Sequence, residues 1–180
     1  MKELSLNILD IAKNSTAARS TEVTISLITD EKGLLTMTIA DNGCGMEEET
    51  LKRVSDPFYT TRTTRKVGLG IPLLRLAAEQ TGGRVVIESS KDEKCHGTKV
   101  SATFDTTHID FCPVGDIISS ICVLISGNPD IDFVFLDETP ERRVSLDTKE
   151  LRAVLGDVSL AEYEVVMWIK EYLKGQYNKE

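Results

Sequence analysis

Asp41, Gly43, Gly45 and Met46 belong to a short motif whose residue types suit contact with a flat ring. The motif follows an apolar run, Leu34 to Ala40, that predicts a buried strand. The Asp41 carboxylate would lie at the end of that strand and could accept a hydrogen bond from an exocyclic amine. Glycine has no Cβ and tolerates positive φ, so this backbone could pass close to a ring. Alone, such a motif more often marks a plain turn.

A second pair, Asp10 and Asn14, stands four residues apart in a segment with apolar residues at helical spacing. That spacing puts the carboxylate and the amide one turn apart on one helix face. The carboxylate could act as a general base, and the amide oxygen could bind magnesium, which prefers oxygen ligands. From these two residues alone, a solvated polar stripe is the simpler explanation.

A third group combines cations with glycines. Ser55 to Val67 lacks apolar periodicity and carries Arg62, Arg65 and Lys66, so it is expected to be a long loop. Gly68-Leu69-Gly70 then leads into a helix with a proline in its first turn. The free N–H groups of a helix N-terminus favour anions, and the loop cations could meet phosphates. The alternative for the loop is a surface connection without function.

The hydrophobic pattern predicts the elements that must position these groups. The last of these elements is a strand that begins with Gly97 and Thr98, which offer a small residue and a hydroxyl. The expected elements are helices over Glu3 to Arg19, Glu47 to Val54 and Ile71 to Gln80, and strands over Glu22 to Thr29, Leu34 to Ala40, Arg84 to Ser89 and Gly97 to Phe104.

Taken in order, these features resemble the GHKL ATP-binding superfamily. It includes the catalytic domains of histidine kinases, the type II topoisomerase ATPase region, the mismatch-repair ATPases and the ninety-kilodalton heat-shock chaperones. The likeness covers Glu3 to about Phe104, and Asp56-Pro57-Phe58-Tyr59-Thr60-Thr61 is similar to the lid motif of histidine kinases. The resemblance implies an α+β fold, a two-layer α/β sandwich of the GHKL (Bergerat) type, similar to a stand-alone histidine-kinase-type domain that binds ATP and Mg2+.

The resemblance also implies a role for each matching residue. Asn14 would bind Mg2+, Asp41 would hydrogen-bond the adenine amino group, and Thr98 would complete the polar contacts to the base. The residues implied to line the adenine pocket are Gly43, Gly45 and Met46, and those implied to contact the phosphates are Thr60, Thr61, Arg62, Arg65, Lys66, Gly68, Leu69 and Gly70.

Two positions depart from the family pattern. Many members carry a further glycine where this chain has Lys66, so the lid is expected to close with a different geometry. Asp10 occupies the position at which ATP-hydrolysing members and anti-sigma-type serine kinases often have a glutamate base. His96 and His108 are expected to be ordinary polar side chains, so transfer of phosphate to histidine is not expected.

Residues 106–180 follow the part that resembles the family, residues 1–105, and are predicted to form a small α+β module with an interaction role. No catalytic group of residues is found there, and Trp168 is expected in the core. The expected elements are a helix from Val114 to Ile125, a hairpin of Ile131 to Leu136 with Arg142 to Leu146, a helix capped by Asp147 and ending near Leu155, and a helix from Ser159 to about Leu173.

Composition narrows the class of protein. The 180 residues carry a formal charge of −8 without a basic cluster, which argues against binding nucleic acid. The four cysteines form no Cys-x-x-Cys pair and indicate reduced thiols in a cytoplasmic protein. No signal peptide or membrane-spanning run is found. The first helix starts within a few residues of Met1, which favours a natural start.

Three functions remain open from the sequence. The first is a Mg-ATP-dependent ATPase with Asp10 as general base. The second is a protein kinase that acts in trans on a serine or threonine of a partner. The third is a non-catalytic module that senses nucleotide. In any of the three cases a protein partner is expected to bind through residues 106–180.

Overall fold

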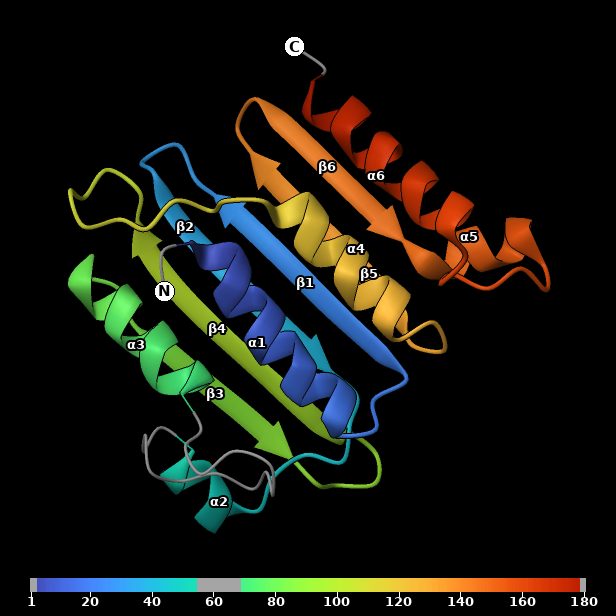
Figure 1. The fold of residues 1–180 in the computed structure, drawn as a ribbon. Helices are drawn as coiled ribbons and strands as arrows, with labels where there is room; N and C mark the ends of the chain where they lie inside the picture. The colour runs from blue at the N-terminus through green and yellow to red at the C-terminus, as the bar shows by residue number, and fades with distance from the viewer. Residues whose placement is uncertain (1–2, 55–68, 179–180) are drawn as a thin grey trace.

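The protein is a two-layer sandwich in which helices cover one face of a six-stranded sheet (Figure 1). The computed structural model describes residues 3–54 and 69–178. The strands are β1 (Glu22–Thr29), β2 (Leu34–Asp41), β3 (Val85–Ser90), β4 (Gly97–Asp105), β5 (Asp132–Thr139) and β6 (Arg142–Asp147). The helices are α1 (Leu4–Ala17), α2 (Glu48–Arg53), α3 (Gly70–Gln80), α4 (Ile117–Gly127), α5 (Thr148–Leu155) and α6 (Tyr163–Tyr177). This architecture confirms the fold class expected from the sequence.

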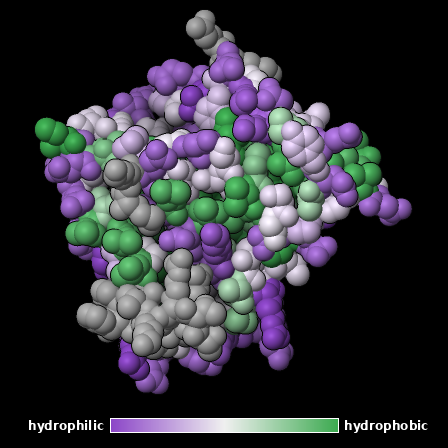
Figure 2. Space-filling view, in the orientation of Figure 1, coloured by the Kyte–Doolittle hydropathy of each residue, from purple (hydrophilic) through white to green (hydrophobic). Residues whose placement is uncertain are grey.

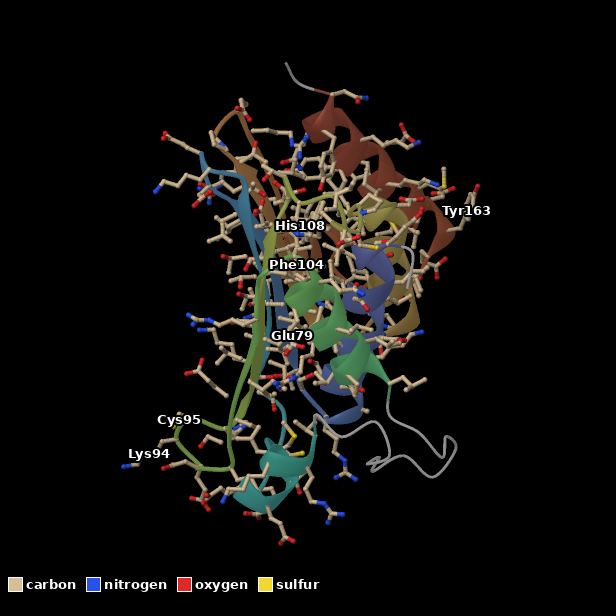
Figure 3. All side chains as sticks on the ribbon, turned by 90° about the vertical axis from the view of Figure 1, so that its left-hand side faces the viewer. Glu79, Lys94, Cys95, Phe104, His108 and Tyr163 are labelled. Atoms are coloured by element: carbon tan, nitrogen blue, oxygen red, sulfur yellow. The ribbon has the colours of Figure 1, made fainter. Side chains whose placement is uncertain are left out.

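The strand order is β3-β4-β2-β1-β5-β6. Strand β1 pairs with β5 in parallel, and the other neighbouring strands are antiparallel. Alternate side chains of β1 face the helices and are buried, whereas Thr24 and Ser26 face the other side of the sheet. Figure 3 shows this arrangement edge-on, with the helices to one side of the sheet only. The hydrophobic core therefore lies between α1, α3, α4 and α6 and the inner face of the sheet.

The chain after residue 105 continues the same sheet. In the parallel pairing, Ile25 of β1 lies opposite Phe135 of β5, and both side chains are buried. The backbone N–H groups of Leu4 and Ser5, at the start of α1, donate to the carbonyls of Pro113 and Val114 over 2.9 and 2.8 Å. The expected division into residues 1–105 and 106–180 stays a prediction, and strands from both parts share one core.

Three expectations for the C-terminal part are wrong in detail. Helix α4 begins at Ile117 because Gly115 has φ of +75° and the Asp116 side chain caps the helix by accepting from the N–H of Ser119. Helix α6 begins at Tyr163, after a turn in which the N–H of Glu162 donates to the Ser159 carbonyl. Trp168 is not in the core: its side chain is 50% exposed and its ring stacks on Tyr172 at 4.9 Å.

The surface of the helical layer is mixed in polarity. Figure 2 shows hydrophobic residues near the middle of this face, over α1 and α4, with hydrophilic residues around them. Among the described residues, no helix combines the length and the apolar character needed to cross a bilayer.

Candidate functional site

The Asp41 motif and Thr98 lie together at one end of the sheet. Asp41 ends β2, and Thr98 is the second residue of β4, directly opposite Asp41 in the register. The loop after Asp41 lies against the C-terminal end of α1, where the N–H of Cys44 donates to the Ala18 carbonyl over 3.0 Å. Figure 3 places Cys95, in the β3–β4 turn, at the same end of the sheet.

The Asp41 carboxylate is held by two backbone donors. Its Oδ1 atom accepts from the N–H of Gly43 at 2.9 Å and from the N–H of Thr98 at 3.2 Å. These bonds fix the orientation of the half-buried carboxylate. Within the described part of the chain no group donates to Oδ2, so this oxygen can accept a hydrogen bond from a ligand.

The two glycines of the motif are required by close packing. A Cβ on Gly43 would lie 2.8 Å from the Cβ and the carbonyl oxygen of Ala18. Gly45 has φ of +66°, and a Cβ there would lie 1.9 Å from the Ser90 carbonyl oxygen. The loop is thus confined between the end of α1 and the end of β3, and the half-buried Met46 lies two residues before the start of α2.

Ser89 is a site residue that the sequence did not indicate. Its Oγ accepts from the N–H of Met46 at 2.8 Å, donates to the Gly97 carbonyl at 3.0 Å and contacts the Thr98 hydroxyl at 2.8 Å. One signal could have revealed it: strand alternation places Ser89 on the same face as Val85 and Ile87, the face that packs on the helices. A hydroxyl at such a position needs polar partners.

Asn42 and His96 also support the loop. The Asn42 side chain accepts from the N–H groups of Thr21 and Glu22 at 2.9 and 3.0 Å and donates to the Thr21 hydroxyl at 2.9 Å. Nδ1 of His96, expected to be an ordinary polar side chain, lies 2.8 Å from the Gly43 carbonyl oxygen. The motif therefore has a scaffold from β1 and from the β3–β4 turn.

The start of α3 lies against α1. Gly70 begins α3, and a Cβ on it would lie 3.8 Å from the Cβ of Asp10 and 3.5 Å from Cδ1 of Ile11. The N-cap residue, Leu69, has no side chain that can accept a hydrogen bond, so the first turn of α3 presents backbone N–H groups that an anion could bind. Asp10 is half-buried beside this turn, and Asn14 is exposed one turn further along α1.

Several predicted phosphate contacts cannot be placed. Thr60, Thr61, Arg62, Arg65, Lys66 and Gly68 lie outside the described residues. Within the described ranges no cluster of three or more histidine, cysteine, aspartate or glutamate side chains could hold a metal by itself. The Asn14 amide oxygen is nevertheless the type of donor that Mg2+ accepts together with phosphate oxygens and water.

Comparison with protein families gives one match that spans the site. Residues 1–108 match the family described as histidine kinase-, DNA gyrase B-, and HSP90-like ATPase. The match includes the helix with Asp10 and Asn14, the Asp41 motif, the start of α3 and Thr98.

Two curated relatives are kinases. The chain is 36% identical over 69 residues to sporulation kinase E of Bacillus subtilis, which is 38% of this chain and 9% of that protein. It is 30% identical over 87 residues to the sensor histidine kinase CitA of Klebsiella pneumoniae, which is 47% of this chain and 16% of that protein. The matched region is thus a small part of each relative.

One solved structure extends the likeness beyond the family match. The ATPase domain of MutL from Aquifex aeolicus, solved in complex with ADP, superposes with a TM-score of 0.56 at 13% identity and covers 97% of this chain and 70% of that one. At this identity the likeness concerns the fold, and it includes the C-terminal strands.

Proposed function

Because the chain belongs to the family of histidine kinase-, DNA gyrase B- and HSP90-like ATPases, we propose that it binds Mg-ATP and hydrolyses it with Asp10 as general base. The observation that carries this proposal is the position of Asp10 beside the first turn of α3. A helix N-terminus favours phosphate, so a carboxylate next to it is within reach of a water at the terminal phosphate.

Different residues of the described part would contact the base, the phosphates and Mg2+. Oδ2 of Asp41 would accept from the adenine amino group, and the Thr98 hydroxyl would complete the polar edge. The N–H groups of the first turn of α3 would bind phosphate oxygens. Asn14 would supply an amide oxygen to Mg2+, which would neutralise charge on the phosphates.

The chemical step is a transfer of the terminal phosphoryl group to water. Asp10 takes a proton from the attacking water as its oxygen bonds to the γ-phosphorus, the bond from that phosphorus to the bridging oxygen breaks, and ADP leaves. Transfer to a serine or threonine of a partner would follow the same course, with the hydroxyl in place of water.

The test is phosphate release from Mg-ATP by the wild-type protein and by Asp10→Asn, together with calorimetric titration of ADP. General-base catalysis contributes about 10²–10⁴-fold, so Asp10→Asn should lose about that factor in turnover while it still binds ADP. Asp41→Asn is the matched control for binding. In this variant the amide NH2 group takes the place of Oδ2, so two hydrogen-bond donors, this group and the adenine amino group, would face each other. This variant should bind ADP at least about tenfold more weakly.

Each outcome has a distinct meaning. Equal turnover by wild type and Asp10→Asn would exclude Asp10 as the base. ADP binding without turnover would favour transfer in trans or nucleotide sensing. No binding of ADP by the wild type would overturn the proposal as a whole.

We also propose a protein partner for residues 106–180, which lie almost wholly beyond the family match. The support is the exposed aromatic surface of α6, where Tyr163, Trp168 and Tyr172 are 75%, 50% and 43% exposed. Retention of one cellular protein by the wild type but not by Trp168→Ala would favour this proposal, and equal retention would count against it. A cytoplasmic location stays a prediction.

A further inference from the structure

The Ser89 hydroxyl has all of its hydrogen-bonding capacity occupied. A hydroxyl has one hydrogen and two lone pairs, and Oγ of Ser89 has three partners at 2.8 to 3.0 Å. The Gly97 carbonyl can only accept, so it takes the Ser89 hydrogen. The N–H of Met46 can only donate, so it takes one lone pair. The other lone pair is left for Thr98, whose hydroxyl must therefore donate to Ser89.

This arrangement decides what Thr98 offers to a ligand. Its only hydroxyl hydrogen is directed at Ser89, so toward a ligand Oγ1 can act only as an acceptor. Asp41 lies opposite Thr98 in the register, and the Thr98 N–H donates to Oδ1 of Asp41 at 3.2 Å. The remaining carboxylate oxygen is likewise an acceptor. The edge formed by Asp41 and Thr98 therefore presents acceptors only.

We propose that Ser89 is a specificity-determining residue: by accepting the Thr98 hydrogen it keeps the site selective for a 6-aminopurine over a 6-oxopurine. This inference rests on the proposed ATP binding and adds to it a residue that sets the choice of base. An amino group at position 6 donates to both acceptors, whereas an oxo group there would face them with a third acceptor. The N1–H group beside that oxo group has a single hydrogen and can pair with only one of the two. Ser89 acts through Thr98 and is a positioning residue.

The test compares ADP with inosine diphosphate, because the two ligands differ only in the group at position 6 and in the proton on the adjoining N1. Binding of either ligand can be measured without hydrolysis. Calorimetric titration of the full chain gives the ratio of the two dissociation constants. In Ser89→Ala the Thr98 hydroxyl is free to rotate and donate to an oxo group, so the preference for ADP should fall about tenfold. Ser89→Thr keeps a hydroxyl and should restore the preference.

Ser90→Ala is the matched control. The neighbouring Ser90 hydroxyl accepts from the N–H of Asp92 at 3.1 Å and does not contact Thr98 in the described structure. If Ser89→Ala only damaged the structure of the site, it would weaken the binding of ADP and of inosine diphosphate equally. The ratio of the two dissociation constants would then be unchanged. An unchanged ratio in Ser89→Ala, or an equal fall in Ser90→Ala, would overturn the inference.

Thr98→Val gives an independent answer if Ser89→Ala does not fold. If the Thr98 hydroxyl is an acceptor, its removal weakens ADP but not inosine diphosphate, and the preference for ADP falls. If the hydroxyl instead donates to the oxo group at position 6, its removal weakens inosine diphosphate and the preference for ADP rises. A rise or no change would overturn the inference. Failure of the wild type to bind ADP at all would count against the proposed function rather than against Ser89 alone.

Discussion

At the scale of single residues, the candidate site depends on the Asp41 carboxylate, whose two oxygens differ in their hydrogen bonds. Backbone donors from Gly43 and Thr98 occupy Oδ1 of Asp41, and no group of the described residues donates to Oδ2. Such orientation by backbone groups is stable because it does not require the ordering of further side chains. The loop after Asp41 must keep its conformation for the Gly43 N–H to donate to Oδ1. Gly45 is the residue that permits this conformation.

Gly45→Ala and Gly82→Ala separate two effects of a glycine. Both positions have positive φ, +66° and +73°, so either alanine should cost about 1–2 kcal/mol of stability. Only at Gly45 would the new Cβ meet an atom, the Ser90 carbonyl oxygen, whereas nothing lies within 4 Å of the Cβ at Gly82. Gly45→Ala should therefore unfold at a lower urea concentration than Gly82→Ala, and it should lose ADP binding. Equal affinity for ADP in the two variants would contradict this account.

At the scale of elements, a partly buried polar cluster of Tyr177, Asp137 and Arg142 attaches α6 to the sheet. The Tyr177 hydroxyl donates to Oδ2 of Asp137 at 2.6 Å, and Asp137 is only 8% exposed. The Arg142 guanidinium lies over the Tyr177 ring, 4.5 Å from its centroid, and 3.6 Å from the same carboxylate oxygen. Burial, followed by the hydrogen bond to Asp137, raises the pKa of Tyr177 above its ordinary value.

Tyr177→Phe should lower the free energy of unfolding by about 1–3 kcal/mol, because Asp137 would lose its buried donor. The effect should depend on pH. Since the folded-state pKa of Tyr177 is raised, its contribution is complete below the pKa of the unfolded chain, about 10, and is lost as pH rises from there toward the folded-state value. Urea unfolding at pH 8 and above pH 10 measures this difference.

Tyr163→Phe is the control for that experiment. The Tyr163 side chain is 75% exposed, so its replacement should change the free energy of unfolding by less than about 0.5 kcal/mol. A difference between wild type and Tyr177→Phe that stayed constant from pH 8 to above pH 10 would exclude the raised pKa as its source.

At the scale of the whole molecule, residues 106–180 pack against α1, the helix that carries Asp10, and against the strand beside it. Strand β5 pairs with β1 from Glu22 to Ile28, and α4 packs beside α1. The start of α1 donates to the backbone of the segment that precedes α4. Helix α4 thus contacts both α1 and α6, so it lies between the helix that carries Asp10 and the helix that carries Trp168.

A chain shortened to residues 1–105 tests the expected domain division. It would expose the edge of β1 and the side of α1 that packs on α4, so we expect a lower melting temperature, aggregation and weaker ADP binding than in the full chain. A monomeric fragment with the stability and affinity of the full chain would instead support two independent domains.

The sequence by itself determined the local features of this protein. Alternation and helical periodicity predicted β1 and β2 within one residue, because these patterns depend on neighbours in the chain. That Asp41 faces a ligand stays a prediction. The order of motifs also indicated the family. In these cases short-range backbone geometry is enough to decide the outcome.

Only the tertiary structure decided which distant parts meet. The parallel pairing of β1 with β5 cannot be read from alternation, since a strand pattern says which face is buried but not which strand lies beside it. Ser89 joins Met46, 43 residues away, and no local pattern marks that bond. Trp168 is exposed because α6 buries the face that carries Val165, Ile169 and Leu173, and the residue just before Ile169 lies off that face.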